Sequence, residues 1–200
     1  MTNTTLRTTF SYKEYMALTE KLVAEGKTTG PNQSEAMAHY TKMNLARMRR
    51  LNKTLSINEE LETAISGLQG NYTFQVLTEA WCGDAAQNVP ILAKIVDANP
   101  NLQMELILRD DNLDLMDQHL TNGGRSIPKL LVVDEDTKEV VATWGPRPAP
   151  VQQMVMDRKH MDESIRPPYS EFVQVVQKWY NKDKTQTAQA ELTKVFSDIQ

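Results

Sequence analysis

The sequence predicts an α/β fold, in which a four-stranded mixed sheet is flanked by helices, with extra helices before it and a helical extension after it. Three observations lead to this prediction. Apolar residues at helical spacing give way to a β-branched and aromatic run at residue 72. A helical segment separates that run from a second one, which predicts a parallel crossover. Two later strand-like runs lie close together, which predicts an antiparallel hairpin.

The N-terminal part, residues 1–57, is expected to be a helical extension with two helices. From residue 11 to about residue 27, apolar side chains recur at helical spacing, and Gly26 is a plausible stop signal. The second helix begins after Ser34 as its N-cap and carries a broad apolar stripe rich in methionine. A methionine stripe at this spacing indicates packing more often than a partner surface.

The central part, residues 58–160, holds the predicted sheet. It opens with a helix capped by Asn58, and Pro90 lies inside the next helix, where it should kink the helix or cost a hydrogen bond. The elements expected after the first helix are a strand at 72–78, a helix at 85–100, a strand at 102–110, a helix at 111–120, and strands starting at 129 and 139.

The C-terminal part, residues 161–200, is expected to be a helical tail packed on this domain. One helix, at 149–165, is broken by the pair Pro167-Pro168. Another starts at Ser170, and the pattern favours its continuing through a polar stretch toward the C-terminus.

Composition restricts the function classes. The chain has 22 Lys and Arg against 26 Asp and Glu, a net charge of −4, which gives no electrostatic argument for nucleic-acid or membrane binding. No apolar run suits a signal peptide or a membrane span, so a cytoplasmic location is expected. A single cysteine excludes an intrachain disulfide, and with three dispersed histidines it indicates no metal site. No cofactor is expected.

Two short motifs give this element order a family resemblance. Trp81-Cys82-Gly83-Asp84-Ala85 stands between the first strand and the next helix, and Arg125-Ser126-Ile127-Pro128 precedes the hairpin. From residue 58 to about residue 160, the motifs and the elements around them resemble the thioredoxin superfamily.

Cys82 is the candidate catalytic residue. A thiol at the first turn of a helix faces free backbone N–H groups and the positive end of the helix dipole, which favour the nucleophilic thiolate. Gly83 leaves room for an approaching disulfide, and Trp81 supplies an apolar surface that can bury the attacking sulfur. Asp84 suits the dipole, but its negative charge opposes thiolate formation.

The resemblance implies further site residues. The Ile127-Pro128 bond is a candidate cis peptide, and in the thioredoxin family the matching proline packs beside the cysteine while the residue before it offers backbone groups to a substrate peptide. Arg125 lies close by in the sequence. The family's glycine after its last strand matches Gly145, which would bring Arg147 and Trp144 to the rim of the same groove.

Departures from the family pattern limit the chemistry. The second cysteine of the C-x-x-C motif is replaced by Ala85, so an external thiol would have to resolve any mixed disulfide. The family's buried acidic residue is replaced by Val76, and the threonine or serine of peroxiredoxins by Glu79. The C-G of the monothiol glutaredoxin C-G-F-S motif is present. The residues that pair with the charges of glutathione in glutaredoxins are not visible in this sequence.

Two hypotheses therefore remain from the sequence. In the first, Cys82 exchanges with the disulfide of a protein or a low-molecular-weight thiol, with low or partner-dependent turnover and a role in redox homeostasis. In the second, the fold has lost turnover and the Ile127-Pro128 groove holds an extended peptide or a partner protein. The oligomeric state is open in both.

Overall fold

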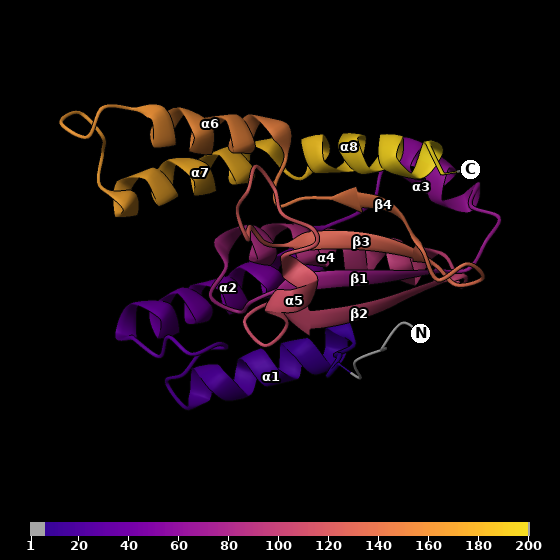
Figure 1. The fold of residues 1–200 in the computed structure, drawn as a ribbon, viewed down its shortest axis with the longest axis horizontal. Coiled ribbons are helices and arrows are strands. Elements are labelled where there is room, and N and C mark those ends of the chain that lie inside the picture. The colour runs from indigo at the N-terminus through magenta and orange to yellow at the C-terminus, as the bar shows by residue number, and fades with distance from the viewer. Residues whose placement is uncertain (1–6, 200) are drawn as a thin grey trace.

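The computed structural model describes residues 7–199 and has an α/β fold around one mixed sheet (Figure 1). The strand order is β2-β1-β3-β4, with β1 parallel to β2 and antiparallel to β3, and β3 antiparallel to β4. The predicted crossover and hairpin are thus confirmed. The strands are β1 (Tyr72–Thr78), β2 (Leu102–Leu108), β3 (Lys129–Asp134) and β4 (Val140–Trp144).

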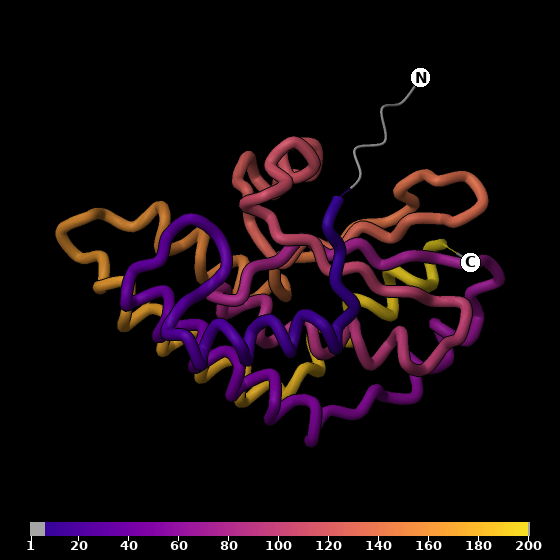
Figure 2. Tube along the Cα trace, turned by 90° about the horizontal axis from the view of Figure 1, so that it is seen from below, coloured from indigo at the N-terminus to yellow at the C-terminus, as the bar shows by residue number. Residues whose placement is uncertain are grey.

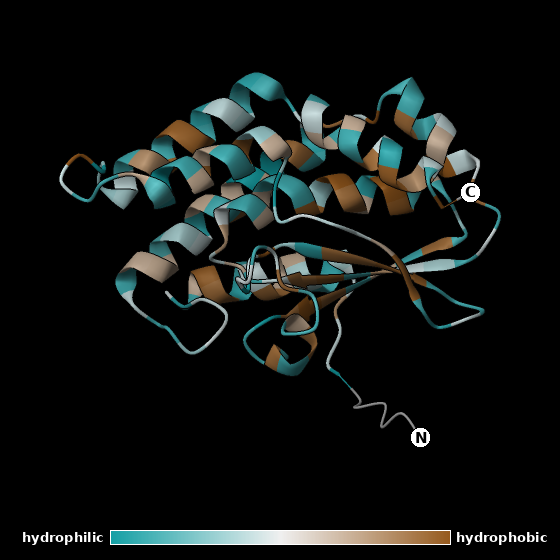
Figure 3. Ribbon diagram, turned by 45° about the horizontal axis from the view of Figure 1, so that its top comes forward, coloured by the Kyte–Doolittle hydropathy of each residue, from teal (hydrophilic) through white to brown (hydrophobic). Residues whose placement is uncertain are grey.

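The long helices gather on one face of the sheet, and the short α5 lies on the other (Figures 2 and 3). On the helical face, α2 packs against α4, α3 against α8, and α6 against α7. The helices are α1 (Tyr12–Ala24), α2 (Glu35–Thr54), α3 (Glu59–Ser66), α4 (Gly83–Ala98), α5 (Leu113–Met116), α6 (Ala149–His160), α7 (Tyr169–Asp183) and α8 (Gln186–Ser197).

Capping residues set several helix starts where the sequence indicates them. Ser11 forms a capping box with Glu14 at the start of α1, and the Asn58 side chain accepts the Leu61 N–H at the start of α3. Ser34 precedes α2 without a side-chain cap bond. Pro90 lies inside α4, which continues as a helix to Ala98.

The sequence prediction is wrong in two helical segments. The helix expected at 111–120 is the four-residue α5 followed by turns, because the N–H groups of Gln118 and His119 bond to carbonyls three residues back instead of four. The tail helix expected to run on from Ser170 is broken at Lys184 and Thr185, which both have positive φ, so α7 and α8 are separate.

The segment before α1 covers one edge of the sheet, and α8 contacts the strand at the other edge, most of which stays exposed. At the β2 edge, Phe10 exchanges two backbone hydrogen bonds with Leu106. At the β4 edge, α8 packs beside the strand, and Trp144 donates its indole N–H to Glu191 at 2.8 Å. The division of the chain at residues 57 and 160 stays a prediction. No helix in residues 7–199 is long and apolar enough to span a membrane.

The last helix contributes to the main core, and this can be tested at Phe196. Its ring is fully buried and stacks on Phe74 with the centroids 5.4 Å apart. We expect Phe196→Ala to lower the free energy of unfolding by about 3–5 kcal/mol in urea titrations, because it leaves a cavity. Val175→Ala, at an exposed site on α7, should cost less than about 0.5 kcal/mol. Equal, small losses in both variants would contradict this packing.

Candidate functional site

Cys82 lies at the N-cap of α4, between β1 and the helix, with extended backbone angles. Its Sγ accepts the N–H of Ala85 at 3.5 Å and donates to the carbonyl oxygen of Ile127 at 3.3 Å. The residue is only 8% exposed, although it lines a pocket. The Ile127-Pro128 peptide is cis. A thiol that donates a hydrogen bond carries its proton, so this geometry is that of a neutral cysteine.

Burial is the main influence on the Cys82 thiol. The pKa of Cys82 is raised to about 12, chiefly by burial and to a smaller extent by the negative charge of Asp84. The N–H of Ala85, the charge of Arg147 and the N–H of Asp84 act in the opposite direction. The helix N-terminus therefore does not outweigh desolvation, and the thiol is protonated at neutral pH.

Asp84 ties three separate segments together beside the thiol. Its Oδ2 lies 2.8 Å from Nε of Arg147, in the loop after β4, and its Oδ1 accepts the hydroxyl of Tyr180 on α7 at 2.8 Å. Burial raises the pKa of Asp84, and the Arg147 guanidinium and the Tyr180 hydrogen bond lower it. Asn88, one turn along α4, donates to the Tyr180 oxygen at 3.3 Å. This network holds α7 against the N-terminus of α4.

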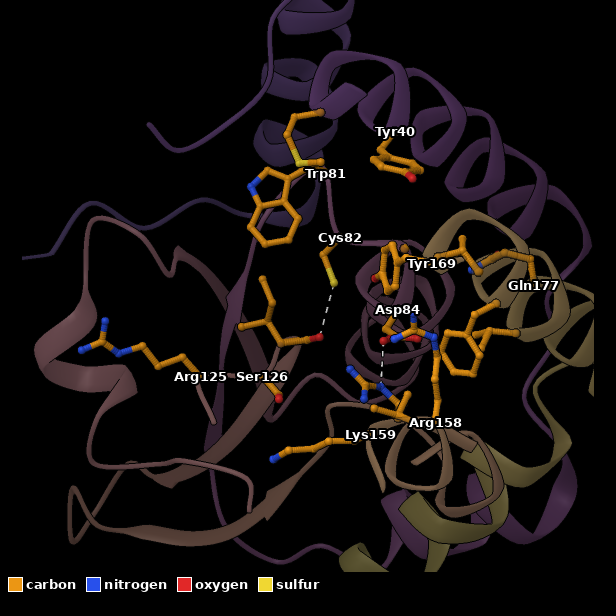
Figure 4. A pocket seen from close by; sticks show the side chains of 18 of the residues that line it. Tyr40, Trp81, Cys82, Asp84, Arg125, Ser126, Arg158, Lys159, Tyr169 and Gln177 are labelled. Carbon is orange, nitrogen blue, oxygen red and sulfur yellow. Dashed lines mark hydrogen bonds and ion pairs between the residues drawn. The ribbon is translucent and has the colours of Figure 1, made fainter. Parts of the chain in front are cut away.

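A cavity of about 560 Å³ opens over Cys82, which is within the usual size range of small-molecule sites. Figure 4 shows the Cys82 sulfur pointing into it. The wall combines residues of α2, of the two motif loops and of the α6–α7 pair. The lining residues are Met37, Tyr40, Arg47, Trp81, Cys82, Gly83, Asp84, Arg109, Arg125, Ser126, Ile127, Arg147, Val155, Arg158, Lys159, Arg166, Tyr169, Phe172, Val173, Val176 and Gln177.

Most site residues chosen from the sequence meet at this cavity. Those that line it with Cys82 are Trp81, Gly83, Asp84, Arg125, Ile127 and Arg147. Those that do not are Ala85, Pro128 and Gly145.

Ala85, Pro128 and Gly145 lie outside the cavity wall. Ala85 is buried, and its N–H meets Sγ of Cys82. Gly145 has φ +104° and lies against Pro128, where a Cβ would clash with the proline carbonyl oxygen. Trp144, expected at the rim, is buried and turns toward Glu191.

Trp81 and Arg125, one from each sequence motif, already have partners within the protein. The Arg109 guanidinium lies 5.0 Å from the centre of the Trp81 ring, a cation–π contact. Arg125 forms a two-pronged, exposed ion pair with Asp117 at 2.6 and 2.8 Å. Gly83 is partly covered, because a Cβ there would lie 3.3 Å from Nε2 of Gln177. The approach to the thiol is therefore from the cavity.

The part of the site that the sequence did not reveal comes from the added helices. Residues such as Tyr40 and Arg47 on α2, and Lys159 and Tyr169 on α6 and α7, lie far from both motifs in the chain. Tyr180 on α7, which donates its hydroxyl to Asp84, is also far from both motifs in the chain. The signal available was a concentration of basic residues around residues 158–166. Among residues 7–199, no three His, Cys, Asp or Glu side chains converge on a possible metal position.

The sheet and the site together define a thioredoxin-like fold. Strands β1 and β2 are parallel, β3 and β4 form an antiparallel hairpin, and α4 starts at Cys82, which lies beside the Ile127-Pro128 peptide. A family model described as thioredoxin matches residues 30–163, more than half of the chain. The chain therefore belongs to the thioredoxin family.

Two solved structures share the fold. One is a protein of unknown function, PA1234, from Pseudomonas aeruginosa, with a TM-score of 0.58 and 18% identity over 96% of this chain and 99% of that one. The other is an HIV epitope scaffold of the 4E10 series, with a TM-score of 0.55 and 18% identity over 94% of this chain and 99% of its own. No curated protein sequence matches. At such identities the likeness concerns the fold alone.

Asp84 offers a test of the electrostatics. Asp84→Asn removes a negative charge beside the thiol and leaves Arg147 in place, so the pKa of Cys82 should fall. Each unit of decrease should speed exchange with a small neutral disulfide about threefold at neutral pH, because the thiolate fraction rises tenfold while its nucleophilicity falls. The unfolding free energy should drop by about 3–5 kcal/mol, because a largely buried guanidinium loses its partner.

The control for this variant is Asp97→Asn, at an exposed position near the other end of α4. It should change neither the exchange rate nor the stability appreciably. An Asp84→Asn protein with an unchanged or slower exchange rate would contradict the role of the carboxylate.

Proposed function

We propose that this protein is a monothiol thioredoxin-like protein, in which Cys82 forms a mixed disulfide with a disulfide bound in the cavity and an external thiol releases it. The observation that carries the proposal is the position of the one thiol: it stands at a helix N-cap, beside Ile127-Pro128, and on the wall of a small-molecule-sized cavity.

The raised pKa makes free exchange slow. Relative to an ordinary thiol with a pKa of ~8.5, a value of about 12 cuts the thiolate fraction at neutral pH about 3000-fold. Thiolate nucleophilicity rises about 40-fold over the same interval, so the net rate falls by about two orders of magnitude. Disulfides that meet Cys82 only by collision should react poorly.

Binding in the cavity can offset this loss. Effective molarities of well-oriented groups reach about 10⁵ M or more, which exceeds the deficit of about two orders of magnitude. The Cys82 thiolate attacks one sulfur of the bound disulfide, one S–S bond forms as the other breaks, and the leaving sulfur departs as a thiolate. The proton released from Cys82 passes to solvent or to the leaving thiolate. The shielded thiol would thus select disulfides that the cavity binds.

The second candidate is a binding protein without turnover. Three features favour this candidate. Ala85 replaces the resolving cysteine, Val76 replaces the family's buried acidic residue, and Cys82 is protonated. An extended peptide fits less well than a compact ligand, because the Ile127 carbonyl already accepts the thiol and the α6–α7 pair contributes to the cavity wall.

The kinetics of exchange separate the two candidates. Because the pKa of Cys82 is raised to about 12, the rate with a small neutral disulfide should be low near neutrality and still increase above about pH 10, where a free cysteine has levelled off. A disulfide that the cavity binds should react with saturation kinetics. If every disulfide tried reacts without saturation and about a hundredfold more slowly than free cysteine, only the binding protein remains.

A restored second thiol tests the geometry. Ala85→Cys places a thiol in the first turn of α4, where the Ala85 N–H meets Sγ of Cys82. This variant should release a captured thiol without any external thiol, as a C-x-x-C pair does. The control is Ala86→Cys, which adds the same thiol at the neighbouring buried position. Equal release from both variants, or from neither, would contradict a thioredoxin-type site.

A further inference from the structure

The cavity over Cys82 has a charge opposite to that of the whole protein. The chain carries a net charge of −4, yet the cavity wall holds many cations and a single carboxylate, Asp84, which is already paired with Arg147. Its seven cationic residues are Arg47, Arg109, Arg125, Arg147, Arg158, Lys159 and Arg166. A recess lined by one sign of charge with apolar walls concentrates the field and attracts ions of the other sign.

Three of these cations have no carboxylate of their own. Within residues 7–199, no Asp or Glu lies within ion-pair distance of Arg47, Arg158 or Lys159. Arg47 is partly desolvated, which lowers its pKa, and it donates a hydrogen bond to the neutral Asn44 side chain at 2.6 Å. A partly buried cation without a counter-charge is unfavourable unless an anion binds beside it.

The two cations of α6 that lack an ion-pair partner within residues 7–199 lie beside the cavity, close to the thiol. Figure 4 shows Lys159 and Arg158 on the same side of Cys82, whereas the Arg125 side chain extends away from Cys82 and pairs with Asp117. Aromatic side chains complete the wall: the Arg158 guanidinium lies 5.5 Å from the ring centre of Tyr169 and 5.4 Å from that of Phe172. These rings hold Arg158 in place and offer apolar surface to the body of a ligand.

We propose that the cavity binds an anionic low-molecular-weight disulfide whose arms carry carboxylates on both sides of the S–S bond. The central sulfurs would face Cys82, and the carboxylates would meet the cations around it. For its covalent step this inference rests on the proposed function. The recognition itself requires only the cavity and its charges.

A set of matched disulfides tests the charge preference. The probes are 3,3′-dithiodipropionate, bis(2-hydroxyethyl) disulfide and cystamine, which have similar size and are dianionic, neutral and dicationic. Each rate of mixed-disulfide formation is divided by that of 2-mercaptoethanol, a thiol without a further charged group, which corrects for intrinsic reactivity. We expect the dianion to exceed the dication by about tenfold or more at low salt, and by clearly less at about 0.5 M salt. Equal normalised rates, or a preference for the dication, would overturn the proposal.

Lys159 is the residue to change, because it is exposed, lines the cavity and makes no ion pair with residues 7–199. Lys159→Gln should weaken binding of the dianion about threefold to tenfold without altering stability. Its matched control is Lys178→Gln, the same charge change at an exposed position of α7 outside the cavity. If both substitutions lower binding equally, the attraction is only that of the overall charge, and the proposed site is wrong.

Cys82→Ser separates this inference from the proposed function. The variant cannot exchange, so calorimetric binding of 3,3′-dithiodipropionate and cystamine reports recognition alone. Preferential binding of the dianion supports the site, even if the wild-type protein forms no mixed disulfide and the proposed function fails. If the dianion binds this variant no better than the dication, the site proposal is wrong whatever the exchange rates are.

Discussion

The buried carboxylate of Asp84 is the contact on which the site depends. It joins α4 to Arg147 after β4 and to Tyr180 on α7, with both contacts at 2.8 Å. By holding α7 against the N-terminus of α4, it fixes one wall of the cavity over Cys82. The same carboxylate also opposes the thiolate by its charge. One side chain thus fixes the tail helix and suppresses the reactivity beside it.

Local patterns in the sequence were sufficient for the sheet and the thiol. Runs of apolar residues rich in β-branched and aromatic side chains predict the sheet, and the motif around Cys82 places it at a helix start, as observed. The break at Lys184 and Thr185 could not be predicted, because neither residue is a usual helix breaker and both take positive φ in the tertiary context. The cavity wall was missed for another reason: Arg47 and Lys159 meet Cys82 only after distant helices pack together.

Shielding and charge together explain why a monothiol site would be kept. The cysteine lacks its resolving partner at Ala85 and carries a proton, so it is protected against indiscriminate exchange. In our proposal, the cationic cavity would concentrate and orient a chosen reaction partner, which the thiol alone does not do. Selectivity would then come from binding rather than from an activated nucleophile.

The central claim is that desolvation outweighs the helix N-terminus at Cys82. The direct measurement is the ultraviolet absorbance of the thiolate, followed against pH in the folded protein and corrected with Cys82→Ser for tyrosine ionisation. The account predicts no thiolate signal below about pH 10, since the pKa is raised to about 12. A midpoint at or below about 8.5 would contradict it, because the thiol would then be an ordinary or activated nucleophile.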